Sequence, residues 1–510
     1  MCYNELVCTL TKKTLGMRHV TFKCTDKVPD EPHRKSKTEI VMNKNKNFTE
    51  GPLFFKISLF ALPILLTGLL QIAYGMADNI IVGKFSGDNL ALAAVGCTGT
   101  LSTLIVNLLM GIAGGTGIVI SQCYGAKDSE KVSECVHTSL AFSVIGGIAF
   151  AIFGLIISKP ALMLIGTKPE ILDKATLYIR IICLGIPANS LYNFGANILR
   201  GTGNSRVPLV ILGSSGLCNV LLNVFFVLAL HMSVDGVAIA TIASQYISAI
   251  AVMVVLAAKK EESYGFRFSE LRIDPTMLRR ILRVGIPVGV QSLVFSVANI
   301  IVTASLNTFP TTVVTANTIS GNIDAITWSV INSFGIAEMT FVGQNCGAKK
   351  PDRVKKSVNY AMLQTAIVVL ITASIEFLLL DQMIGLYLSD SDPARQEIVT
   401  YVKTIVSIML GTYIIFSVPN TMCAGISGLG HSSRSLIVNM VFICGLRVLW
   451  ILIAVPLIGN ITALIAGYPI SWVVGGTVSI IVFIKTFGKF KKDCEKESEE
   501  TPEAIPSEQA

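Results

Sequence analysis

The sequence predicts an all-α membrane protein with twelve transmembrane helices, arranged as two homologous six-helix lobes around a central cleft. Three observations support this prediction. Charged residues make up 15% of the chain, against about 25% in ordinary soluble domains. Apolar segments of about 20 residues, the length that spans a bilayer, follow one another from Ile57 to Phe487. The second half of the chain also repeats the first.

The apolar segments are expected to be helices, because the alternating pattern of a transmembrane β-barrel is absent. Several contain proline or glycine, which permits kinks and close helix contacts in membranes. In chain order the twelve spans cover residues 57–82, 90–120, 134–158, 176–198, 206–230, 234–258, 280–306, 313–343, 358–380, 398–424, 434–456 and 461–486.

The repeat is clearest in one motif. The segment Gln122-Cys-Tyr-Gly-Ala-Lys127 recurs 222 residues later as Gln344-Asn-Cys-Gly-Ala-Lys349. Other pairs lie at offsets of 220–227 residues, namely Pro63 with Pro287, Asn79–Val82 with Asn299–Val302, and Gly201-x-Gly203 with Gly428-x-Gly430. Because six spans is an even number, both halves enter the membrane in the same direction. This predicts a parallel repeat about an axis along the membrane normal.

The distribution of charge predicts the topology. With a cytoplasmic N-terminus, the inner loops hold 17 Lys and Arg residues and the outer loops hold five. The positive-inside rule therefore favours a multi-pass protein in the lipid bilayer with both termini in the cytoplasm. The net charge of +8 is explained by this topology, so no nucleic-acid partner is expected.

The chain divides into five parts. Residues 1–50 form a polar, basic N-terminal tail without the apolar core of a signal peptide, and Met42 is the expected true start. Residues 51–258 form the N-terminal lobe, 259–279 a cytoplasmic linker, and 280–487 the C-terminal lobe. Residues 488–510 are expected to be a disordered cytoplasmic tail, because they end in an acidic stretch rich in Ser and Pro.

Asp78 is the main candidate for a functional residue. It is the only ionisable residue between Ile57 and Val82, and charge within the hydrocarbon region is costly. A carboxylate there avoids that cost by taking up a proton or by holding a cation, and either event would couple an ion to transport. The alternative is that Asp78 lies at the outer interface, in water, and only caps or pairs.

A series of polar residues in spans four to six could form a cage around Asp78. Within each span their spacing of four residues places them on one helix face. They could instead hydrogen-bond between helices as structural contacts, and the spacing alone favours neither reading. The series is Tyr178, Asn189, Asn193, Asn197, Asn219, Asn223, Thr241 and Gln245.

The C-terminal lobe carries its buried charges elsewhere. The position that corresponds to Asp78 is Ala298 or Val297. Arg447 lies in the middle of a span and needs a buried anion, for which Asp324 or Glu338 is the expected partner. The resulting pair would be structural, or it would bind substrate. Glu376 is a further acidic residue within a span of this lobe.

The sequence offers no signature of an enzyme or of a nucleotide-driven pump. The spans contain no HExxH, GxSxG or His-cluster motif, and the chain has no GxxxxGK[ST] loop. The twelve cysteines have no metal-ligand spacing. Neither a resident metal nor a cofactor is therefore expected, and an ion gradient is the expected source of energy.

Together the motifs resemble those of the multidrug and toxic compound extrusion (MATE) transporters of bacteria. The resemblance runs from about Gly51 to Lys489. The segments that carry it are Ala61-Leu-Pro63, Asp78-Asn-Ile-Ile-Val-Gly83, Gln122-x-x-Gly-Ala-Lys127, Leu199-Arg-Gly-Thr-Gly-Asn204, Asn219-x-x-x-Asn223, Gly236-Val-Ala-Ile-Ala-Thr241, Val342-Gly-Gln-Asn-x-Gly-Ala348 and Tyr468-Pro-Ile-Ser-Trp472.

The resemblance implies alternating access by two lobes in the bacterial cytoplasmic membrane. It implies export of amphipathic, often cationic small molecules in exchange for Na⁺ or H⁺, by a protein expected to be a monomer. Asp78 would hold the cation, surrounded by Tyr178, Asn193, Asn219 and Thr241. Asn223 stands where related members carry a second carboxylate, which puts proton coupling through a carboxylate pair in doubt.

A flippase for lipid-linked saccharides is the alternative function from the same broad superfamily. Such a protein needs a strongly cationic cavity for pyrophosphate, and here only Arg447 lies deep in a span. The cation-binding acidic residue of the other branch of the family is also absent, because span seven reads Gln291-Ser-Leu-Val-Phe295 at that place.

Overall fold

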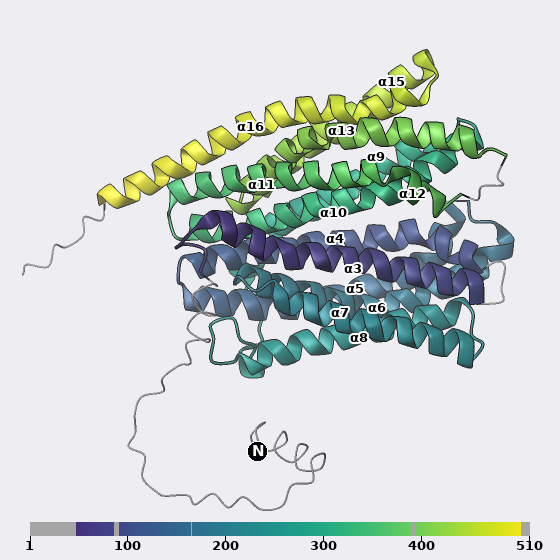
Figure 1. Ribbon diagram of the computed structural model, residues 1–510. Helices are drawn as coiled ribbons and strands as arrows, with labels where there is room; N and C mark the ends of the chain where they lie inside the picture. Colours follow the sequence, from purple (N-terminus) through teal and green to yellow (C-terminus); the bar gives the residue numbers. More distant parts are fainter. Residues whose placement is uncertain (1–46, 86–90, 165, 389–392, 501–510) are drawn as a thin grey trace, which may run out of the picture. The chain divides into compact units, whose positions relative to one another are not determined.

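A computed structural model describes residues 47–85, 91–164, 166–388 and 393–500, and within them it contains helices and no strands (Figure 1). The first half forms α3 (Leu53–Phe85), α4 (Ala91–Gly125), α5 (Ser129–Leu164), α6 (Pro169–Gly201), α7 (Arg206–Val224) with the π-helical η1 (Phe225–Ala229), and α8 (Val234–Ala258). The second half forms α9 (Pro275–Leu306), α10 (Thr311–Gly347), α11 (Pro351–Leu378) with the short α12 (Leu380–Gly385), α13 (Arg395–Gly428), the run α14 (Ser432–Ile437), η3 (Val438–Gly445) and α15 (Leu446–Ile458), and α16 (Ile461–Glu500). Each of the twelve predicted spans corresponds to one of these helices or helical runs, apart from residue 90, which lies outside the described residues, and single residues at the end of η1 and between α11 and α12.

Eleven helices of the described chain are long and apolar enough to cross a membrane. The exception among the twelve predicted spans is α6. This helix carries Asp173, Lys174 and Arg180 in its first half and three asparagines in its second, so its composition is less apolar than that of its neighbours. It is nevertheless packed inside the N-terminal lobe, against α4, α5 and α8.

The two lobes repeat the same helix pairings. In the N-terminal lobe α6 packs on α4, α5 and α8, and in the C-terminal lobe α13 packs on the corresponding α10, α11 and α16. The lobes meet where α4 lies against α9 and α10, and where α3 lies against α10. Figure 1 shows this division, with purple to teal helices in one lobe and green to yellow helices in the other.

The contact between α4 and α9 depends on glycines. A methyl group on Gly111 would overlap the backbone of Gly289, and one on Gly115 would overlap the backbone of Gly285. Small residues permit such close helix packing in membranes, where dispersion contacts hold helices together. The prediction that glycines mediate close approach is therefore confirmed at the boundary between the lobes.

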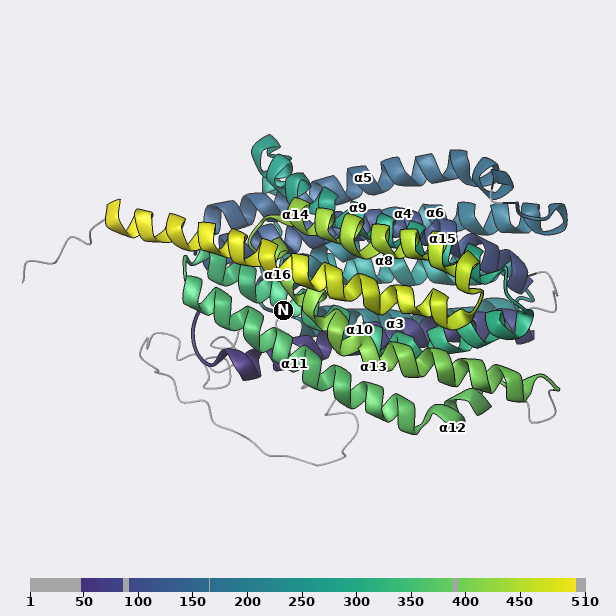
Figure 2. The same ribbon diagram turned by 90° about the horizontal axis from the view of Figure 1, so that it is seen from above.

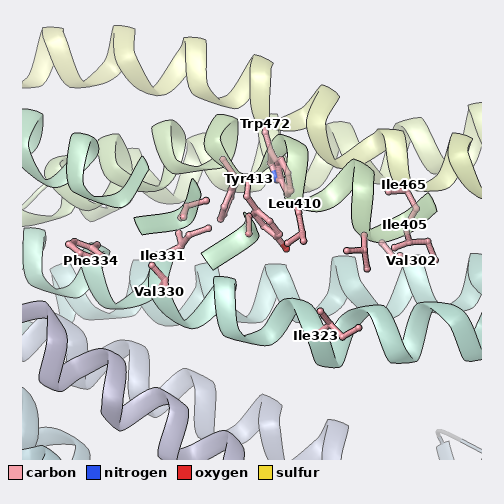
Figure 3. Packing of buried hydrophobic residues seen from close by; sticks show 14 of the residues in the cluster. Val302, Ile323, Val330, Ile331, Phe334, Ile405, Leu410, Tyr413, Ile465 and Trp472 are labelled. Carbon is pink, nitrogen blue, oxygen red and sulfur yellow. The ribbon is translucent and has the colours of Figure 1, made fainter. Parts of the chain in front are cut away.

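The core of the C-terminal lobe is built on aromatic side chains (Figure 3). Tyr413 stacks on Trp472 with ring centroids 5.3 Å apart, and Phe416 lies 5.0 Å from the same indole. Both Tyr413 and Trp472 are almost completely buried. This packing leaves the Tyr413 side chain few rotamers, and so fixes the direction of its hydroxyl group.

Two expected boundaries need correction. Residues 488–500 were expected to be disordered, but α16 continues to Glu500 and projects beyond the other helices in both views (Figure 1 and Figure 2). Good helix formers fill this segment, and the Nζ atom of Lys349 lies 2.5 Å from the Oε2 atom of Glu497. The expected linker 259–279 is also shorter, since α9 begins at Pro275, where the Asp274 side chain accepts a bond from the Met277 N–H.

The end of the N-terminal tail packs against the C-terminal lobe. Phe48 is 2% exposed, and its ring stacks on that of Phe341 with centroids 3.9 Å apart. Residues 47–50 therefore belong to the folded protein, whereas the sequence suggested a continuous tail over 1–50. Met42, the expected start, lies outside the described residues, as do residues 501–510.

Candidate functional site

Asp78 lies opposite Asn223 in the N-terminal lobe. The Nδ2 group of Asn223 on α7 donates a hydrogen bond of 2.5 Å to the Oδ1 atom of Asp78 on α3. One turn earlier, the Tyr74 hydroxyl group donates to the carbonyl oxygen of Gly213 over 3.0 Å, and its ring lies directly on Gly216. The small residues of α7 thus let α3 approach closely and bring the carboxylate to the amide.

Two further residues of the predicted cage converge on this pair. The Oδ1 atom of Asn219 accepts a weaker bond of 3.4 Å from the same Asn223 amide. Tyr178 of α6 lies close enough to Asp78 for an electrostatic interaction. Asn223 is completely buried and Asn219 is 5% exposed. Among the described residues, no partner satisfies the Asn223 Oδ1 or the Asn219 Nδ2 atom.

Of the remaining cage candidates, the asparagines of α6 and Thr241 bond within their own helices, whereas the Oε1 atom of Gln245 has no hydrogen-bond partner among the described residues. The Nδ2 group of Asn193 donates to the backbone and side-chain oxygens of Asn189, and that of Asn197 donates to the Asn193 carbonyl oxygen. Thr241 donates to the Val237 carbonyl oxygen on α8. Within the part of the chain that the structure describes, neither Asn193 nor Thr241 is hydrogen-bonded to Asp78.

We call Asp78, Asn219 and Asn223 together the α3–α7 site. It offers one carboxylate and two amide oxygens. Oxygen ligands of this kind suit hard cations, and a carboxylate alone can carry a proton. The described residues contain no group of three His, Cys, Asp or Glu side chains that could hold a metal ion. These groups are of the kind that can bind a proton or a cation.

The C-terminal lobe contains a second polar site, on α10, α11 and α13. The Tyr413 hydroxyl group donates over 2.5 Å to the Oδ2 atom of Asp324. One helical turn further along α10, the Thr327 hydroxyl group lies 3.0 Å from both carboxylate oxygens of Glu376. Thr327 and Tyr413 are not predicted from the sequence; Thr327 follows Asp324 by one helical turn, a signal visible in the sequence, whereas Tyr413 comes from a separate helix.

Asp324 forms part of the wall of a cavity of about 120 Å³ between α10, α13 and α16. Asn317, Ser320 and Tyr468 supply further polar groups to its lining, and Met409 and Leu410 supply apolar ones. The Oδ1 atom of Asp324 is buried and has no hydrogen-bond partner among the described residues. The cavity therefore combines one acidic group with a mixed polar and apolar wall.

The expected ion pair of Arg447 is wrong. No salt bridge joins Arg447 to Asp324 or Glu338 among the described residues. The guanidinium group instead lies over the ring of Tyr468, 4.1 Å from its centroid, because an aromatic face can stabilise a desolvated cation. Glu338 is 1% exposed and lies in a separate apolar cluster near Gly425, where neither carboxyl oxygen has a hydrogen-bond partner within the described part of the chain.

Comparison with known proteins identifies the same fold and repeat. The MatE family model matches residues 63–225 and again residues 287–453, once in each lobe. The probable multidrug resistance protein YoeA of Bacillus subtilis is 26% identical over 401 residues, which cover 77% of this chain and 85% of YoeA.

Two further proteins, which are less identical to this chain in sequence, also match it. The multidrug export protein MepA of Staphylococcus aureus is 23% identical over 372 residues, which cover 71% of this chain and 80% of MepA. A solved crystal structure of a MATE protein in its bent conformation superposes with a TM-score of 0.80 at 21% identity, covering 89% of this chain and 99% of that one. At this identity the structural likeness establishes the fold alone.

Proposed function

The chain belongs to the MatE family, and we propose that it exports amphipathic, cationic small molecules by exchange with Na⁺ or H⁺. It is a multi-pass membrane transport protein and not an enzyme. The observation that carries the proposal is the α3–α7 site, in which the lone carboxylate of α3 meets a buried amide of α7. This arrangement provides one ion-binding position inside a lobe whose helices must move during transport.

The Asp78 carboxylate is the group that exchanges the coupling ion. In the described state the Asn223 amide donates to it and stabilises the anion. An arriving proton or Na⁺ would compete with this amide for the same carboxylate oxygen. The freed amide would then rotate and present its oxygen, together with that of Asn219. Ion binding would thereby change the contact between α3 and α7, which links the ion to a change of conformation.

The substrate is proposed to bind between the lobes, with its positive charge near the cavity of Asp324. The carboxylate of Asp324 supplies negative charge, while the partly exposed ring of Trp328, stacked 5.2 Å from the buried ring of Phe416, supplies an aromatic surface nearby. Polar side chains in the middle of apolar helices are also exposed, namely Gln71 on α3 and Asn322 and Asn332 on α10. Amides avoid lipid, so their exposure supports a water-filled space between the lobes.

The end of the helical bundle that carries Lys127, Lys260 and Lys349 is proposed to face the cytoplasm. We call it the basic end. The excess of Lys and Arg in its loops supports this orientation, and it places the N-terminus and the end of α16 on the cytoplasmic side. A flippase for lipid-linked saccharides is disfavoured, because the polar sites inside both lobes are built on carboxylates. The protein is proposed to act as a monomer.

Transport by the purified protein in liposomes tests the proposal. Na⁺ and pH gradients are imposed separately, and efflux of a fluorescent lipophilic cation is measured. We expect one gradient to drive efflux and Asp78→Asn to abolish it, while the variant remains folded. The control Asp173→Asn removes a carboxylate with an 88% exposed side chain in the same lobe, and it should transport normally. Normal efflux by Asp78→Asn under either gradient would show that this site does not couple the ion.

A further inference from the structure

Two glutamines of the repeated motif join the lobes crosswise at the basic end. The Nε2 group of Gln122, near the end of α4, donates to the carbonyl oxygen of Gly428, the last residue of α13. The Nε2 group of Gln344, near the end of α10, donates to the carbonyl oxygen of Gly201, the last residue of α6. Both bonds are 2.9 Å long. Each lobe thus gives one donor and one acceptor to the other.

The oxygen ends of the two amides are bonded as well, to parts of the chain far from each glutamine in sequence. Arg280 of α9, in the C-terminal lobe, donates over 3.1 Å to the Oε1 atom of Gln122. The backbone N–H of Phe48, in the segment that leads into α3, donates over 3.2 Å to the Oε1 atom of Gln344. Both ends of each glutamine side chain are therefore bonded to the opposite half of the chain.

The backbones at this point leave no room for side chains. A methyl group on Gly125 would overlap the carbonyl oxygen of Gln344, and one on Gly347 would overlap the carbonyl oxygen of Gln122. Both helices end at these glycines, and two residues later Lys127 and Lys349 have left-handed φ angles of 58° and 53°. The Gln-x-x-Gly-Ala-Lys repeat thus supplies the bonding group, the close contact and the helix end.

Ordinary helix packing explains these contacts less well than a reversible connection. The acceptors are the carbonyl groups of helix-terminal residues, which have no partner within their own helix. They lie at the end of the bundle, where water can replace the glutamine once the lobes separate, although Gln344 is buried in the closed state. A permanent contact has no need of such exchangeable partners, whereas a contact that opens in every transport cycle does.

We propose that Gln122 and Gln344 form a reciprocal latch: their two crosswise bonds and the Arg280 bond hold the two lobes together at the basic end and must break before that end opens, while the Phe48 bond orients Gln344. The glutamines act as positioning residues, because they set the balance between closed and open states without touching the ion or the substrate. The inference rests on the proposed function only for its role in transport. The latch itself concerns only how the two lobes are held together.

Hydrogen–deuterium exchange on the full-length protein in nanodiscs tests the latch. We compare Gln122→Ala, Gln344→Ala and the double variant with the wild type. Gln122→Ala loses two bonds between the lobes and Gln344→Ala loses one, which at their usual net strength corresponds to about 30-fold and about 5-fold in the ratio of closed to open protein. Exchange at residues 118–126, 198–204, 340–348 and 425–431 should accelerate by about those factors, and more in the double variant, because exchange reports the open fraction.

Asn420→Ala is the matched control. Its Nδ2 group donates over 3.3 Å to the Ile331 carbonyl oxygen, within the C-terminal lobe, so its loss should leave these four segments unchanged. If the double variant does not fold, the single variants decide. Wild-type exchange in both single variants, or equal acceleration by Asn420→Ala, would overturn the latch. Because the measurement uses no substrate or ion gradient, its outcome is independent of whether Asp78 couples the ion.

Discussion

A substitution that adds a methyl group at the boundary between the lobes should open the basic end. The substitution is Gly347→Ala. Its new methyl group would overlap the carbonyl oxygen of Gln122, a backbone atom that cannot rotate away. Ordinary van der Waals contact begins at 3.4 Å, so α10 must move from α4 by more than about 1 Å to restore it.

The magnitude follows from the cost of overpacking. An extra carbon in a well-packed contact typically costs about 1–3 kcal/mol. Only the closed state of the basic end contains this contact, so that cost should shift the ratio of closed to open protein by about 5- to 140-fold at about 1.4 kcal/mol per tenfold. A substitution of one methyl group should thus change the dominant conformation.

Double electron–electron resonance measures the change directly. Spin labels are attached through non-canonical amino acids at Lys131 and Lys356, two exposed positions on opposite lobes, which spares the native cysteines. The longer distance should gain population in Gly347→Ala. Gly321→Ala on the same helix is the control, because its methyl group would meet nothing within 4 Å. An unchanged distance distribution in Gly347→Ala would refute the reasoning.

Three further outcomes are expected. Asn223→Asp should give transport a steeper pH dependence in liposomes, because two adjacent carboxylates share protons; an unchanged pH profile would count against the α3–α7 site. Tyr413→Phe removes the donor to Asp324, and should lower stability by about 1–3 kcal/mol and weaken binding of a lipophilic cation, measured by thermal unfolding and fluorescence. The neighbouring arginine and Ser133 hold the pKa of Glu270 in the linker below its usual range. The bonds that the Glu270 carboxylate accepts from Arg267 and Ser133 therefore stabilise the linker fully above about pH 4.3, the ordinary pKa of a glutamate. As pH falls through the lowered pKa, hydrogen exchange of the linker should accelerate, and Glu270→Gln should remove that pH dependence.

The sequence by itself determined the class, the repeat and the chemical centre of the first site. Apolar length and low charge predict membrane helices, since the bilayer leaves few alternatives. The offset of 222 residues between Gln122 and Gln344 predicts two similar lobes. A lone carboxylate such as Asp78 is conspicuous in an apolar helix, so it could be predicted as a functional residue without knowledge of the residues around it.

Only the tertiary structure decided which polar groups meet. Asn193 and Asn223 follow the same spacing of four residues, yet Asn223 reaches Asp78 while Asn193 bonds along its own helix. The guanidinium group of Arg447 lies on an aromatic ring and not beside the expected carboxylates. Spacing along the chain fixes the face of a helix, but the rotation and approach of separate helices fix the partner. The latch has the same cause: the repeated motif is visible in the sequence, whereas its crosswise bonds exist only because two separate lobes meet.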